Sequence, residues 1–307
     1  MSDMTAADSV LFIGAGRMGG LMAARLADHG VKLSVVDLAE AALAPFRARG
    51  IPVATTAAGM PGQVVITMLP TDAHVRAALL GPEGALAGEP RAVVVDMSSA
   101  APAAIVALAE ELAPGGIAVL DAPVSGGMAG ARAGTLTAMC GGAPDAFARV
   151  RPLLALMCGE VVRVGPVGSG HVLKALNNYL SAATLWTATE ALIIGQRLGL
   201  DPPTMLKVWS AGSGKSHATE VKLPDHVLTG RYDFGQTLDL FCKDISIAID
   251  LAARAGTETP ALEALFANWS SARDTLGGQE DITAIARMIG ASARGAGSMF
   301  DREEGEG

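Results

Sequence analysis

Three glycines and one aspartate form the clearest chemical pattern in the sequence. Gly14, Gly16 and Gly19 follow the apolar run VLFI and open an Ala- and Leu-rich segment. A GxGxxG turn between a strand and a helix lets a pyrophosphate approach the backbone and the unpaired N–H groups of the helix start. Asp37 ends the next apolar run, eighteen residues after Gly19. A carboxylate there can accept both hydroxyls of an adenosine ribose and repels a 2′-phosphate, so the spacing predicts a dinucleotide site that prefers NAD.

Two points about this site stay open in the sequence. Asp37 is followed by LAEAALAPF, and Asp is also a good helix N-cap, so capping is an alternative role for it. Leu38 offers no cation to a 2′-phosphate, so NAD is the expected cofactor and NADP the alternative. Arg17 and Met18 lie inside the glycine turn and are expected to contact the cofactor.

A single charged residue stands in a long apolar segment of the second half. Lys174 is the only fixed charge in residues 164–189, among Leu, Ala, Val, Tyr and Trp. Asn178 follows four residues later and therefore shares a helical face with Lys174, and His171 and Ser181 continue this stripe. A solvated helix face of this length normally carries several Glu, Lys or Arg, so a plain surface stripe is the weaker interpretation.

The first half has the pattern of alternating strands and helices. Short β-branched runs alternate with Ala-rich segments such as 17–29 and 102–113. The expected strands are SVLFIG, VKLSVVD, QVVITML, RAVVVDM and GIAVLDAPV. Continuous apolar strands joined by crossover helices predict a parallel sheet that is covered on both faces. The expected fold class is α/β, with a doubly wound (Rossmann) N-terminal domain.

An all-α domain is expected after the Gly/Pro cluster at 165–170, which marks the boundary between domains 1–166 and 167–307. Helices are predicted over 171–198, 202–210, 236–255, 260–275 and 281–290, and residues 291–307 are expected to form a loose tail. The first of these helices is apolar on nearly all sides. It should therefore be buried, either in its own domain or against a second subunit, which predicts a homodimer or homotetramer.

Composition limits the class of partner. The 307 residues carry a formal net charge of −8 and no dense Lys/Arg run, whereas nucleic acids and anionic membranes require a basic face. The partner is expected to be a small molecule. The first ten residues lack the basic and apolar parts of a secretory signal, and no apolar run reaches the ~20 residues that span a bilayer. A cytoplasmic protein is expected.

Metal and hydrolase chemistry have no support in the sequence. Cys140, Cys158 and Cys242 are far apart and form no CxxC pair, so reduced packing residues are expected. The five histidines show no HxxxH or HxH spacing, and no serine lies in a GxSxG elbow. We therefore expect no metal site.

At DAPVSGGMAGARAGTLTAMCGG (121–142) the chain resembles the β-hydroxyacid dehydrogenases, the group that contains 3-hydroxyisobutyrate dehydrogenase and tartronate semialdehyde reductase. Four blocks match in order: FIGAGRMG, DAPVSGG, GHVLKALNN and KDISIAIDLA. The resemblance that they carry covers residues 10 to about 290. In this family the first domain binds the dinucleotide, and the all-α domain completes the cleft and the oligomer.

The resemblance implies a role for each matching residue. Lys174 would be the catalytic acid/base, and Asn178 its neighbour on the substrate. Ser125, Gly126 and Gly127 would hold the substrate carboxylate, for which consecutive glycine N–H groups beside a serine hydroxyl can form an anion nest. Further cofactor contacts would be Leu69, Pro70, His74, Ser99 and Lys243. The alternatives are a flexible surface loop at VSGGMAG and an ordinary ion-paired Lys243.

The expected activity is NAD-dependent interconversion of a short 3-hydroxy carboxylate and its semialdehyde by hydride transfer. One alternative is an NADPH-preferring reductase of tartronate or succinic semialdehyde, and another is a non-catalytic dinucleotide-binding scaffold. The family commonly has Thr where Ser99 stands and often an aromatic near Thr237. The second departure leaves the shape of the substrate open, and the sequence does not name the acid.

Overall fold

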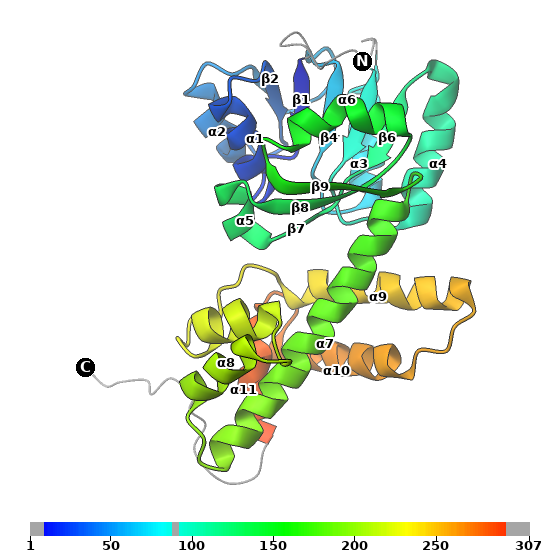
Figure 1. Cartoon of the computed structure of the whole chain (residues 1–307). Coiled ribbons are helices and arrows are strands. Elements are labelled where there is room, and N and C mark those ends of the chain that lie inside the picture. The colour runs from blue at the N-terminus through cyan, green and yellow to red at the C-terminus, as the bar shows by residue number, and fades with distance from the viewer. Residues whose placement is uncertain (1–8, 88–91, 293–307) are drawn as a thin grey trace. The chain divides into compact units, whose positions relative to one another are not determined.

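The computed structural model describes residues 9–87 and 92–292 and divides the chain into two compact units, 1–174 and 175–307. A sheet with its helices forms the first unit, and helices form the second (Figure 1). The boundary expected from the sequence, 166/167, follows directly on the last strand, β9 (Cys158–Gly165). It stays a prediction.

One sheet organises the first unit, with strand order β3-β2-β1-β4-β5-β6-β8-β7 and β9 beside β8. Its other strands are β1 (Val10–Ile13), β2 (Leu33–Val36), β3 (Val53–Ala54), β4 (Val64–Thr67), β5 (Val93–Asp96), β6 (Ala118–Asp121), β7 (Val124–Ser125) and β8 (Leu136–Gly141). Strands β1 to β6 pair in parallel, which confirms the doubly wound α/β class. The prediction of a parallel sheet was wrong in one respect, because β8 runs antiparallel to β6 and β7. Antiparallel neighbours need no long crossover connection, and β7 is joined to β8 by a segment that contains only the short helix α5 (Gly127–Ala133).

Alternate side chains of the central strand face two separate cores. Val10 and Phe12 belong to one core, and Leu11 and Ile13 belong to the other. The first core is covered by α1 (Gly19–Asp28), α2 (Glu40–Arg47) and α6 (Pro144–Leu154). The second is covered by α3 (Asp72–Leu80) and α4 (Pro102–Leu112). Burial on both faces explains why these strands read as continuous apolar runs.

The helices of the second half follow the predicted ranges closely. They are α7 (Ser169–Arg197), α8 (Pro202–Ala211), α9 (Leu238–Ala255), α10 (Pro260–Leu276), the 3₁₀ turn η3 (Ile282–Ala284) and α11 (Ile285–Ser292). Side-chain caps explain two starts, because Asp201 accepts the N–H of Thr204 and Thr237 accepts that of Leu240. The loose tail was expected from residue 291, but 291 and 292 belong to α11, and 293–307 lie outside the described residues.

Two features of this half were not expected. Residues Ala218–Val227 form η2, a π-helix for which the sequence has no distinct signal. Of the two ways in which α7 was expected to be buried, its own domain covers only part of the helix, because Leu180 is 62% and Ile194 59% exposed in the single chain. Its opposite side is fully buried at Ala182 and Leu185. A cover from a second subunit stays a prediction.

The three cysteines are buried free thiols, as expected for packing residues. Burial raises the pKa of Cys140 and of Cys158 to about 12, and it also raises the pKa of Cys242. The described residues contain no group of His, Cys, Asp and Glu side chains that could hold a metal ion. Among the same residues, no helix is long and apolar enough to cross a bilayer.

We predict that a thiol reagent at pH 8 labels none of the three cysteines in the folded protein and all three in urea. The thiolate is the reactive form, and a rise in pKa from 9.0 to about 12 lowers its fraction roughly a thousandfold. The measurement is the number of labelled thiols by mass spectrometry. An Ala211→Cys variant at an exposed position is the positive control and should gain one fast label. Fast labelling of the unmodified folded chain would contradict the prediction.

Candidate functional site

The glycine turn has the geometry that a dinucleotide site needs. Gly14 has a φ of +100°, and a Cβ there would collide with the carbonyl oxygen of Met68. A Cβ on Gly19 would collide with the carbonyl oxygen of Gly14, so helix and turn pack backbone against backbone. A Cβ on Gly16 would instead meet nothing within 4 Å. This open space lies at the start of α1, which has no side-chain cap, and both features fit the approach of a pyrophosphate.

Asp37 is bonded to the glycine turn. Its Oδ2 accepts the N–H of Ala15 at 2.7 Å, and its Oδ1 accepts the N–H of Ala39 at 2.8 Å. The N-cap residue of α2 is Ala39, so capping of α2 by Asp37, the alternative left open by the sequence, is not what the structure has. Each carboxylate oxygen keeps lone pairs for further donors. Leu38 is 84% exposed and brings no charge to this place.

The loop before α3 and the first turn of that helix contain three of the residues expected at the cofactor. The N–H of Leu69 donates to Ser98 Oγ at 2.9 Å, which ties this loop to the one after β5. Pro70 follows, and Thr71 caps α3 by accepting the N–H of His74. The ring Nδ1 of His74 lies 2.6 Å from the Thr71 hydroxyl, on the exposed start of the helix.

The proposed anion-binding segment joins β7 to α5 (Gly127–Ala133). Ser125 is half-buried at the end of β7. Gly126 and Gly127 have φ values of +127° and +60°, which L side chains rarely adopt, so this backbone requires glycine. Their role towards a substrate carboxylate stays a prediction.

A buried carboxylate holds the beginning of α7. Asp121, at the end of β6, accepts the N–H of Gly168 at 2.7 Å and the N–H of His171 at 2.8 Å. A helix start leaves such N–H groups without partners inside the helix. The negative charge of Asp121 also interacts favourably with the positive end of the helix dipole. A Cβ on Gly170 would collide with the Met139 carbonyl oxygen. Glycine at this position is therefore required for the close approach of α7 to the sheet.

The imidazole of His171 is 2% exposed and lies between two carboxylates. Its Nε2 is 3.1 Å from the carbonyl oxygen of Ser98 and 3.6 Å from Asp96 Oδ2. Its Nδ1 is 3.9 Å from Asp121 Oδ2 and makes no hydrogen bond. The other oxygen of Asp96 accepts the Thr67 hydroxyl at 2.8 Å and the N–H of Ser98 at 3.1 Å. The ends of β4, β5 and β6 thus meet the first turn of α7 in one polar network.

His171 was expected on the lysine stripe, whereas no role was predicted for Asp96 and Asp121. Each ends an apolar strand, in the runs VVVD and AVLD. The carboxyl ends of parallel strands form the edge of a sheet where ligands bind. An aspartate at that position was the signal that could have identified both.

In the second unit, Asn178 is held by a carboxylate for which the sequence also predicted no role. Asn178 is buried, and its Nδ2 donates to Asp244 Oδ2 at 2.8 Å. Gln236 reaches the same oxygen at 3.4 Å. Lys243 Nζ lies 3.8 Å from Asp244 Oδ1, a long ion pair that fits the ordinary role left open for this lysine. Its expected contact with the cofactor stays a prediction.

A second lysine is buried in this unit. Lys222, on η2, is 2% exposed and donates to Ser181 Oγ at 2.8 Å. Its ammonium lies 4.8 Å from the ring centroid of Phe234 and 5.6 Å from that of Phe241. Burial, and then the charge of Lys222, lower the pKa of His217. No spacing in the sequence indicated this residue.

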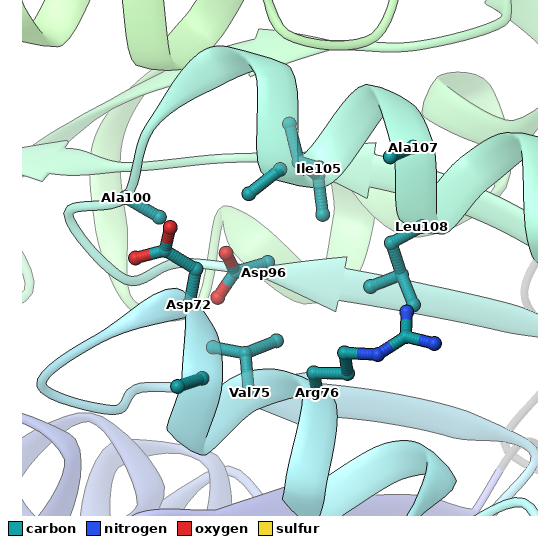
Figure 2. A pocket seen from close by; sticks show the side chains of 10 residues that line it. Asp72, Val75, Arg76, Asp96, Ala100, Ile105, Ala107 and Leu108 are labelled. Atoms are coloured by element: carbon teal, nitrogen blue, oxygen red, sulfur yellow. The ribbon is translucent and has the colours of Figure 1, made fainter.

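A pocket of about 320 Å³ lies between α3 and α4 (Figure 2). Its lining is mostly apolar, with charged side chains at Asp72, Arg76 and Asp96. Arg76 is already paired with Glu111. None of the residues predicted for cofactor or substrate lines this pocket, so it is not assigned as their site.

The predicted residues are thus distributed over both units. The glycine turn, Asp37, the loops of Leu69 and Ser99, the segment 125–127 and Lys174 belong to the first. Asn178 and Lys243 belong to the second. Lys174 is half-buried one helical turn after His171. These roles stay predictions.

Comparisons with known proteins agree over nearly the whole chain. Residues 9–165 match the NAD binding domain of 6-phosphogluconate dehydrogenase, and residues 168–289 match the NAD-binding domain of NADP-dependent 3-hydroxyisobutyrate dehydrogenase. The 2-(hydroxymethyl)glutarate dehydrogenase of Eubacterium barkeri is 33% identical over 92% of this chain and 97% of its own length. The 3-hydroxyisobutyrate dehydrogenase of Pseudomonas aeruginosa is 37% identical over 82% of this chain and 87% of its own.

A solved structure gives the same result. The 3-hydroxyisobutyrate dehydrogenase of Mycobacterium tuberculosis, solved with L-serine, superposes with a TM-score of 0.81 at 28% identity, over 92% of this chain and 99% of its own. Two matched domains and relatives above 30% identity over most of their length support one assignment. The chain therefore belongs to the β-hydroxyacid dehydrogenase family, the dinucleotide-dependent oxidoreductases that include 3-hydroxyisobutyrate dehydrogenase.

Proposed function

We propose that this protein is an NAD-dependent dehydrogenase that interconverts a short 3-hydroxy carboxylate and its semialdehyde. The observation that carries the proposal is the place of Lys174. It is the one fixed charge of an apolar segment, and it lies one helical turn after His171, which is bonded to the loop after β5 and to the end of β6. The same unit contains the dinucleotide turn. An amine in that position suits proton transfer beside a bound cofactor.

Each residue has a defined task in this proposal. The open space at Gly16 and the carboxylate of Asp37 receive the pyrophosphate and the adenosine ribose. A bound nicotinamide supplies the acceptor for the hydride of the hydroxyl carbon. Neutral Lys174 takes the hydroxyl proton, so that hydride and proton leave together and a carbonyl forms.

Asn178 and the segment 125–127 orient the substrate. Asn178, whose amide is fixed by Asp244, donates its remaining N–H to the substrate hydroxyl. The hydroxyl of Ser125 and the N–H groups of Gly126 and Gly127 bind the carboxylate. In the reverse direction Lys174 returns the proton.

The named relatives support the class of substrate. 2-(Hydroxymethyl)glutarate, 3-hydroxyisobutyrate and L-serine appear in the names of proteins similar to this one. All three carry a hydroxymethyl group on the carbon beside a carboxylate. A site with one lysine and one anion-binding segment suits that arrangement.

We predict that the purified protein reduces NAD with at least one of these three acids and is inactive on simple primary alcohols, which lack the carboxylate. The measurement is absorbance of the reduced cofactor in a screen of 3-hydroxy acids with NAD and NADP. Preferential NADPH-driven reduction of a semialdehyde would favour the reductase alternative. Binding of cofactor without turnover of any acid or semialdehyde would favour a scaffold.

We predict that Asp37→Ala weakens NAD binding about tenfold, because the variant no longer accepts hydrogen bonds from the ribose hydroxyls. The difference in affinity between NAD and NADP should also become smaller, because Ala does not repel a 2′-phosphate. The measurement is the Kd of each cofactor by titration calorimetry. Asp37→Asn is the matched control for the turn, since its amide oxygen can still accept one of the two backbone N–H groups. It should gain NADP affinity as well. A tenfold preference of the unmodified protein for NADP, ~1.4 kcal/mol, would show that this interpretation of Asp37 is wrong.

We predict that Lys174→Ala lowers turnover by roughly 10²–10⁴-fold, the usual effect of losing a general acid/base. Lys174→Arg should fail almost as badly, because a guanidinium does not give up its proton in proteins. Oxidation by the unmodified protein should rise with pH, since only the neutral amine accepts a proton.

The measurement is turnover of each variant at several pH values, with NAD binding and thermal unfolding checked separately. Lys207→Ala, at an exposed lysine of α8, is the matched control and should leave turnover unchanged. Near-normal turnover in either Lys174 variant would remove the proposed role.

A further inference from the structure

We propose that His171 is a positioning residue that holds the first turn of α7, and with it Lys174, against the loops that line the cofactor. The inference rests on the proposed function only for the part that Lys174 plays. His171 itself touches neither substrate nor cofactor in this proposal, because its side chain is completely enclosed.

The hydrogen bonds of His171 define how its ring is used. A carbonyl oxygen can only accept, so Nε2 carries a proton and donates it to Ser98 O at 3.1 Å. The backbone N–H of the same residue donates to Asp121 at 2.8 Å. One residue of α7 therefore bonds the loop after β5 through its side chain and the end of β6 through its backbone. Neither Ala nor Leu could make the first of these bonds.

The loop after β5 carries the connection to the cofactor side. Ser98 accepts the N–H of Leu69 through its hydroxyl at 2.9 Å, while its carbonyl accepts from His171. Its own N–H donates to Asp96 at 3.1 Å. Leu69, and Ser99, which directly follows Ser98, are residues predicted to line the cofactor. The buried Ser98 thus joins both cofactor loops to the start of α7.

The helix transmits this position to Lys174. Lys174 lies three positions after His171, which is about 4.5 Å along a helix at 1.5 Å per residue. A helix of this kind moves as a rigid rod over one turn, so a displacement of the first turn moves the lysine with it. Misplacement of a reacting group by about 1 Å can cost roughly 10²-fold in rate.

The test compares two substitutions of similar size. His171→Gln places an amide nitrogen near Nε2 and can donate to Ser98 O, whereas His171→Leu fills the space and donates nothing. We expect kcat of the Leu variant to fall about 10–100-fold, with KM for acid and cofactor within about threefold of the original. The Gln variant should keep kcat within about threefold, a rescue that space-filling alone does not explain.

A second readout does not depend on activity. Hydrogen exchange, followed by mass spectrometry, reports the peptides around Leu69 and around 168–171. Both should exchange at least about tenfold faster in His171→Leu than in His171→Gln, because the Leu side chain cannot donate the hydrogen bond to Ser98 O that links the two segments. Val150→Ala is the matched control: it removes buried apolar contacts from α6 in the same unit and should change neither kcat nor exchange in these peptides.

Each outcome decides the proposal. Unchanged hydrogen exchange in His171→Leu overturns it. A loss of kcat in Val150→Ala as large as in His171→Leu also overturns it, because it would show that lower stability of the first unit is enough to reduce kcat. If the unmodified protein oxidises no acid with either cofactor, the proposed function fails by itself. The exchange measurement then still decides whether His171 holds the three segments together.

Discussion

The carboxylate of Asp121 is the interaction on which the arrangement of the first unit depends. It lies at the end of β6 with no exposed surface and accepts two N–H groups at the start of a 29-residue helix. A buried carboxylate is unfavourable unless hydrogen bonds and opposite charge compensate its lost hydration, and the helix N-terminus supplies both. The glycine at 170 is a consequence, since any side chain there would separate the helix from the sheet.

The second buried carboxylate, Asp96, fixes the strand ends that the start of α7 contacts. It bonds Thr67 of β4 and the backbone of Ser98, so β4 and β5 end in a fixed relation to each other. His171 then connects this pair to β6. Removing one partner from such a network leaves the others buried without a hydrogen bond, which costs more than the bond contributes on its own. The residues of the network therefore act as a unit.

Local patterns in the sequence predicted most of the fold. The strands around VLFI and VVVD, the crossover helices and the helical second half follow from short-range periodicity, and all are present in the structure. The antiparallel β8 and the π-helix η2 were not predicted. Both depend on how distant segments pack, because LTAMCG has no pattern that distinguishes parallel from antiparallel pairing. Exposure of Leu180 and Ile194 likewise depends on what covers α7 and not on its composition.

The candidate site shows the same division between local and distant information. The glycine turn and Asp37 are readable because the chemistry requires one spacing within one βαβ segment. Asp244 is different: it holds Asn178 across 66 positions of the chain, and no local spacing can express that contact. Lys222 and Ser181 are 41 positions apart and pose the same difficulty. The residues expected to touch a ligand were thus proposed from motifs and from the family resemblance, whereas those that orient them became visible only when the fold brought their partners together. This is why His171, which the sequence placed only on a stripe, acquires a specific role through Asp96, Ser98 and Asp121.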